Sequence, residues 1–129
     1  MPEAFTLLNK TKGNQLFGRL PFHAMKNKVL GEEYELSLVL VSESEMRRLN
    51  RDYHGKDAST NILSFPLSKD AGEIFICPAF AKREAHLFDR TPQKYIGFLF
   101  IHGLVHLKGF DHGSTMERKE AKFRTEFGV

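Results

Sequence analysis

The chain of 129 residues is 41% hydrophobic and 27% charged, and its formal net charge is +3 at pH 7. These proportions are typical of a globular protein, and the length predicts one domain, over residues 1–129, with a single hydrophobic core. The one cysteine excludes a disulfide framework within the chain and favours the reducing cytoplasm. No secretory signal and no apolar run long enough to span a bilayer is found, so we expect a cytoplasmic protein without a membrane partner.

The pattern of apolar and turn-forming residues predicts alternating strands and helices. The first half of the chain is predicted to contain a helix within residues 16–30 that is interrupted around Pro21, a strand over 35–41, and a helix from a capping box at Ser42 and Glu45 to about Asn50. A loop over 53–61 is followed by a strand over 62–65 that Pro66 stops, and by a strand over 73–77 that forms a hairpin with it. The second half is predicted to contain a helix from Pro78 to Leu87, a helix from Thr91 to about Lys108, and a C-terminal helix opened by a second capping box at Ser114 and Glu117.

The helix that starts at Thr91 carries apolar residues on every side. Such a helix is expected to be buried rather than to cover one face of a domain. A small sheet that packs with other helices around this buried helix makes the predicted fold class α+β.

Three histidines near the end of this helix have the spacing H-x3-H-x5-H. His102 and His106 lie on the same helical face, because residues four apart almost complete one turn. Gly109 can end the helix in a left-handed conformation, so that His112 returns to the same point. Three neutral imidazoles fit an open tetrahedral zinc site with water as the fourth ligand, although nickel, copper and manganese are compatible with the same ligand type.

The same spacing occurs in the metzincin proteases, which makes the predicted site zincin-like. Those enzymes have a glutamate after the first histidine as the general base, and this chain has Gly103 there, which argues against a peptidase. Asp111 precedes the third histidine. It is a candidate to orient a ligand histidine or to accept a proton in catalysis, and a simple loop-capping role is the alternative.

The residues 102–112, HGLVHLKGFDH, resemble the hallmark of the YbeY endoribonuclease family, H-G-x-L-H-L-x-G-[YF]-D-H. Two more segments are similar to this family, residues 49–66 (LNRDYHGKDASTNILSFP) and residues 72–77 (GEIFIC). The resemblance implies a mixed sheet of about four strands in mostly parallel order. It also implies one metal ion, usually zinc, on His102, His106 and His112, and an activity on single-stranded RNA, notably maturation of the 3′ end of 16S ribosomal RNA and ribosome quality control.

One departure from the family pattern affects the predicted catalytic residues. Where the family has an arginine that is regarded as important for RNA cleavage, this chain has His54. An arginine is permanently charged and can bind phosphate through two hydrogen bonds, whereas a histidine is only partly charged near neutral pH. Either His54 donates to phosphate or carries a proton, or nearby Arg48, Arg51 and Lys56 supply the positive charge for RNA binding, or the activity is weak.

The sequence therefore predicts a metal-dependent endoribonuclease. Its expected partners are single-stranded RNA, ribosomal RNA or the ribosome, and ribosomal proteins. Two other functions stay open at this point. One is a zinc peptidase-like hydrolase, favoured by the histidine spacing, and the other is a non-enzymatic ribosome-assembly factor that the metal stabilises, favoured by His54 in place of arginine.

Overall fold

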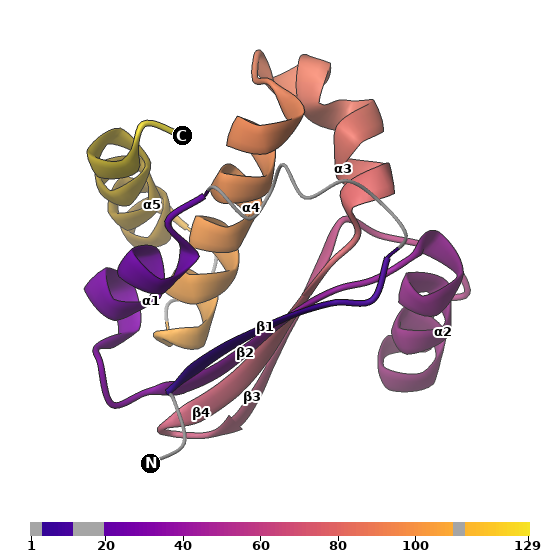
Figure 1. Ribbon diagram of the computed structural model, residues 1–129, viewed down its shortest axis with the longest axis horizontal. Helices are drawn as coiled ribbons and strands as arrows, with labels where there is room; N and C mark the ends of the chain where they lie inside the picture. The colour runs from indigo at the N-terminus through magenta and orange to yellow at the C-terminus, as the bar shows by residue number, and fades with distance from the viewer. Residues whose placement is uncertain (1–3, 12–19, 110–112) are drawn as a thin grey trace.

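The computed structural model describes residues 4–11, 20–109 and 113–129 (Figure 1). Its elements in chain order are β1 (Phe5–Asn9), α1 (Phe22–Leu30), β2 (Glu35–Leu40), α2 (Glu43–His54), β3 (Ile62–Ser68), β4 (Ala71–Ile76), α3 (Pro78–Glu84), the 3-10 helix η2 (Ala85–Phe88), α4 (Pro92–Leu107) and α5 (Ser114–Phe127). This is a mixed α and β architecture, as predicted. In the described ranges, no helix combines the length and the apolar character needed to cross a bilayer.

The four strands form one sheet in the order β1-β2-β4-β3. The pairs β1–β2 and β2–β4 are parallel, and β3 pairs with β4 antiparallel as a hairpin. The hairpin was expected from the sequence pattern, and the mostly parallel order was implied by the family resemblance. Among the described strands, only β3 runs antiparallel, and it forms an edge of the sheet because it is the last strand in this order.

Helices cover both faces of the sheet, with α1, α4 and α5 on one side and α2 on the other (Figure 1). Side chains alternate between the two faces because successive residues of a strand point in opposite directions. In β2, Leu38 belongs to the larger core on the α4 side, and its neighbour Val39 belongs to the smaller core that packs with Met46 and Leu49 of α2. The sheet thus separates two hydrophobic cores.

Helix α4 begins and ends as its sequence predicts. The Oγ1 atom of Thr91 accepts a hydrogen bond from the backbone N–H of Lys94 at 3.2 Å, and Pro92 is the first helical residue. The helix ends at Leu107, and Gly109 follows with a φ angle of +104°. Most side chains between these ends are buried, which confirms the prediction of a central buried helix.

Gly103 lets α4 approach the sheet closely. A Cβ atom at this position would lie 3.0 Å from the Cδ1 atoms of Ile62 and Ile74 and 3.0 Å from the Oγ atom of Ser64. A glycine normally weakens a helix by about 1 kcal/mol relative to alanine. Here it permits direct contact between the helix backbone and strands β3 and β4.

A buried hydrogen-bond network joins the other end of α4 to its surroundings. The hydroxyl of Tyr95 donates to Oε1 of Glu84 at 2.8 Å, and the side-chain amide of Asn61 donates to the same oxygen at 2.6 Å. Burial, together with the Glu84 carboxylate, raises the pKa of Tyr95 above its ordinary value. These bonds connect α4, α3 and the loop before β3.

Two predicted element ends in the middle of the chain were wrong. Helix α2 continues to His54 instead of ending near Asn50, and Gly55 with a φ angle of +70° stops it. The last turn of α2 is exposed and lacks the apolar periodicity that marks a helix in a sequence. Strand β3 continues through Pro66 to Ser68, because an edge strand pairs on one side only and tolerates a residue without an N–H.

The predictions near the two ends of the chain were partly correct. Strand β1 was not predicted, and the helix expected within residues 16–30 is α1, which starts after Pro21; residues 12–19 lie outside the described ranges. The helix expected from Pro78 to Leu87 is α3 followed by η2. Helix α5 is capped at Gly113 without a side-chain bond, so Ser114 is inside the first turn rather than at the cap.

Replacing Gly103 with glutamate, the residue that zincin proteases have at this position, should destabilise the protein by at least about 3 kcal/mol. The new carboxylate would be forced between Ile62 and Ile74, where it has neither space nor a partner. Urea unfolding measures the loss. Gln93→Glu is the matched control, since it adds the same charge in the first turn of α4, where negative charge is tolerated. Equal stability of the two variants would contradict the close approach of α4 to the sheet.

Candidate functional site

The first two histidines of the motif lie in the last two turns of α4. His102 is half-buried and His106 is exposed, and their separation of four residues puts them on one face of the helix. The neighbouring Gly103 faces β3 and β4, so the sheet fixes the rotation of α4 about its axis. The two imidazoles are therefore carried on a helix that packing prevents from turning.

A carboxylate from another helix contacts His102. The Nδ1 atom of His102 lies 2.9 Å from Oε1 of Glu120 in α5. Glu120 is only 6% exposed, and the guanidinium of Arg124 lies 3.7 Å from the same oxygen. Glu120 was not predicted from the sequence, because it lies 18 residues beyond His102 in a helix where both charge signs are frequent. Nothing in its local spacing distinguishes it from its exposed neighbours.

The last part of the motif lies outside the described residues. This applies to His112, the predicted third ligand, and to Asp111, the predicted catalytic residue. The glycines on either side, Gly109 and Gly113, have φ angles of +104° and +153°. Within the described ranges, no group of three histidine, cysteine or acidic side chains comes together as a metal site. The predicted three-histidine site thus stays a prediction, with two of its members placed on one helical face.

His54 lies at the end of α2, where it stacks on an aromatic side chain of β3. Its ring centroid is 5.6 Å from that of Phe65, and the two rings are 15° from parallel. The ring of Tyr53, which is 67% exposed, lies 5.3 Å from Phe65. Phe65 packs with the core on the α2 side, whereas the adjacent Ser64 faces Gly103 of α4. His54 therefore lies on one face of edge strand β3, and helix α4, which carries His102 and His106, packs on the other.

The predicted RNA-binding arginines are paired with carboxylates. Arg48 binds Glu45 at 2.6 Å and lies 3.4 Å from Asp52, and Arg51 lies 3.4 Å from Asp52 and 3.9 Å from Asp57. By contrast, Lys56 has no carboxylate partner among the side chains that the structure describes. The positive charge expected along this segment is thus largely neutralised within the protein at Arg48 and Arg51, and Lys56 keeps its charge available.

A hollow of about 620 Å³ lies over α2 beside these ion pairs. Its lining includes Arg47, Arg48 and Arg51 together with Glu43 and Asp57. Arg47 donates two hydrogen bonds to Asp57, at 2.8 and 2.9 Å, and holds the pKa of that carboxyl below its usual value. The hollow therefore has a mixed rather than a purely cationic lining.

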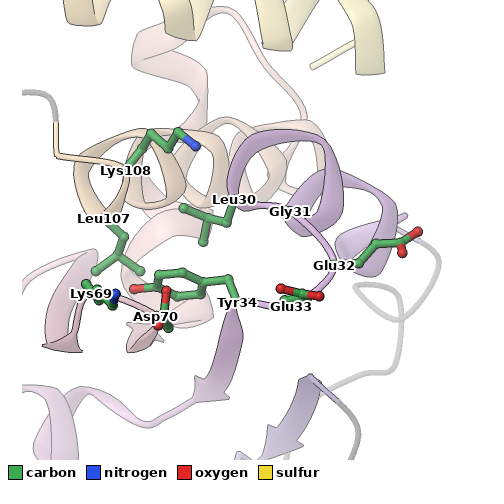
Figure 2. A pocket seen from close by; sticks show the side chains of 9 residues that line it. All are labelled: Leu30, Gly31, Glu32, Glu33, Tyr34, Lys69, Asp70, Leu107 and Lys108. Atoms are coloured by element: carbon green, nitrogen blue, oxygen red, sulfur yellow. The ribbon is translucent and has the colours of Figure 1, made fainter.

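A second pocket, of about 450 Å³, lies at the end of α4 (Figure 2). Leu107 and Lys108 of the motif line it with Tyr34 and with Lys69 and Asp70 of the β3–β4 turn. The Tyr34 ring extends between Leu107 and Asp70, and its buried hydroxyl has no hydrogen-bond partner among the residues that the structure describes. Neither His102 nor His106 lines this pocket, so it is separate from the histidine face of α4.

Comparison with known proteins identifies the family. A family model described as Endoribonuclease YbeY matches residues 6–127, which include all three histidines. The chain belongs to the YbeY endoribonuclease family. This confirms the family that the motifs at residues 49–66, 72–77 and 102–112 indicated.

Relatives in this family share about a third of their residues with the chain. A protein named Endoribonuclease YbeY from Neisseria meningitidis is 38% identical in an alignment over 128 residues. This alignment covers 87% of this chain and 74% of the relative. One of the same name from Thermotoga maritima is 34% identical over 120 residues, covering 90% of this chain and 78% of the relative. A solution structure of a Thermotoga maritima protein, 32% identical, has a TM-score of 0.71 and covers 95% of this chain and 88% of that chain. The chain therefore shares its α+β architecture with this Thermotoga maritima protein.

Proposed function

We propose that the protein is a metal-dependent endoribonuclease that cuts single-stranded RNA, matures the 3′ end of 16S ribosomal RNA and takes part in ribosome quality control. The observation that carries this proposal is the match to the endoribonuclease family over residues 6–127, which contain the complete histidine motif. Placement of His102 and His106 on one face of a rigid helix supports it. We also propose a cytoplasmic location, with ribosomal RNA, the ribosome and ribosomal proteins as partners.

His102 and His106, the described histidines of the motif, fit a zinc ion that we propose is held by these two residues and His112. Because Nδ1 of His102 lies at hydrogen-bond distance from Glu120, Nε2 is the ring nitrogen that would bind the metal ion. Histidine ligands with an open position are typical of catalytic zinc, although nickel, copper and manganese accept imidazoles as well. A divalent ion bound here would supply Lewis-acid chemistry at a phosphoryl oxygen.

The other proposed roles belong to side chains of this chain. Asp111 is proposed to accept a proton during cleavage. His54, which Phe65 holds by stacking, is proposed to donate to the RNA phosphate in place of the family arginine. Arg48, Arg51 and Lys56 are proposed to bind the RNA backbone, with the arginines exchanging their carboxylate partners for phosphate.

No observation supports either alternative function as strongly as the endoribonuclease is supported. A peptidase of the zincin type requires a glutamate where Gly103 packs against Ile62 and Ile74, and the site lacks the space for it. A purely structural assembly factor agrees with His54 but not with membership in a family of endoribonucleases.

Alanine at His102, His106 or His112 should remove metal and RNA cleavage together, because three imidazoles are needed to hold the ion. The measurement is elemental analysis of the purified variants with digestion of single-stranded RNA, with and without chelator. His86→Ala changes an exposed histidine of η2 and serves as the control that keeps both properties. Full cleavage by a metal-free His112→Ala protein would refute the proposal.

Lys56→Ala should weaken RNA binding more than Arg48→Ala does, because Arg48 already has carboxylate partners and Lys56 has none in the described part of the chain. Loss of one phosphate contact should reduce the slope of log affinity against log salt by about 0.7 for a single strand. Fluorescence anisotropy with a labelled single-stranded RNA at several salt concentrations measures both quantities. A larger loss at Arg48 than at Lys56 would contradict this order of contributions to RNA binding.

His54→Ala should lower the rate constant of RNA cleavage at least about tenfold, since a positioned proton donor contributes factors of this size or more. Stability should change little, because the imidazole is exposed. His54→Arg should retain cleavage, since a guanidinium can also stack on Phe65 and bind phosphate. Single-turnover cleavage of a short RNA provides the measurement. Unchanged rates in both variants would leave His54 without a catalytic role.

A further inference from the structure

Glu120 of α5 is a carboxylate in an environment that normally excludes one. Its side chain is 8% exposed, and the core residue Met116 precedes it by one helical turn. Removing a carboxylate from water is costly unless hydrogen bonds and opposite charge compensate for it. The two polar partners in contact with its Oε1 atom are Nδ1 of His102, at 2.9 Å, and the guanidinium of Arg124, at 3.7 Å. The burial of Glu120 is therefore explained by what it contacts.

Arg124 is itself held in place on α4. Its guanidinium lies 4.9 Å from the ring centroid of Phe98, and the guanidinium of Arg90 lies 4.4 Å from the same ring. Arg90 also donates to the backbone oxygen of Val129 at 2.8 Å, which ties the end of the chain to this cluster. These contacts fix α5 against α4, and with it the position of the Glu120 carboxylate beside His102.

The hydrogen bond with Glu120 determines which ring nitrogen of His102 can bind a metal ion. An ionised carboxylate can only accept, so a hydrogen bond between Oε1 of Glu120 and Nδ1 of His102 requires the proton on Nδ1. In that tautomer, Nε2 is the ring nitrogen with the lone pair that a metal ion needs. The bond also restricts rotation of the imidazole about its side-chain torsions. A histidine that must bind a metal ion through Nε2 needs both properties.

We propose that Glu120 is a positioning residue, which sets the tautomer and the orientation of His102 so that Nε2 binds the metal ion. The inference rests on the proposed function, because it assumes that His102 is a ligand. It adds that α5, which carries none of the three histidines, is part of the metal site through one buried side chain. Carboxylates that orient ligand histidines in this way contribute about 10-fold to 100-fold to metal affinity.

The test compares zinc affinity of Glu120→Leu, Glu120→Gln and Glu117→Gln by competition with a chromogenic chelator. Leucine keeps the volume and helix propensity but removes the acceptor, so affinity should fall about 10-fold to 100-fold. Glutamine can still accept from Nδ1, so its loss should be smaller. Glu117 is exposed one turn earlier in α5, and its variant should bind zinc like the unchanged protein. Thermal unfolding of the metal-free proteins checks that all variants fold.

A second measurement reports the tautomer without any metal. In nitrogen-15 spectra of the imidazole rings, His102 should be the Nδ1–H tautomer in the unchanged protein and a mixture of tautomers in Glu120→Leu. Unchanged zinc affinity and an unchanged tautomer in the leucine variant would overturn the role of Glu120 while leaving the metal site intact. If His102→Ala bound zinc as tightly as the unchanged protein, the metal site itself would be wrong. The two failures are therefore distinguishable.

Discussion

The close packing of α4 on the sheet is the constraint on which the rest of the molecule depends. Gly103 brings the helix backbone within contact distance of Ile62, Ile74 and Ser64, and the buried residues of the helix fill the larger core. Because protein interiors are packed as densely as organic crystals, a helix held in this way can adopt only one rotation about its axis and one position along that axis. That rotation decides which side chains of the motif leave the core, and it directs His102 toward α5 instead of the sheet.

The same close packing accounts for Gly103, which is an unusual residue for a histidine motif of this spacing. A position between two ligands on a helix points about 100° away from the first of them, and here that direction leads into the sheet. A proton-transferring side chain could not be accommodated at 103. The proposed acid–base groups must then come from other segments: His54 is the last residue of α2, and Asp111 follows α4 in the sequence.

The surface of α2 carries less free positive charge than its number of arginines suggests. Arginines that lie close together in sequence suggest a cationic surface, but helical spacing also places Glu45 and Asp52 one turn from Arg48. Exposed pairs of this kind contribute little to stability, so they can open at small cost when phosphate competes for the guanidinium. The arginines of α2 would therefore become available to an RNA strand only when it displaces their carboxylate partners.

Features that depend on neighbours along the chain could be predicted from the sequence alone. The caps at Ser42 and Thr91, the left-handed Gly109 and the β3–β4 hairpin are all local patterns, and the described part of the chain shows them. The partner of His102, the reason for Gly103 and the continuation of β3 past Pro66 became clear only from the folded chain. The first two depend on elements distant in sequence, α5 and the sheet, and the third depends on the position of β3 at the edge of the sheet. A side chain's environment is set by what packs against it and not by what precedes it.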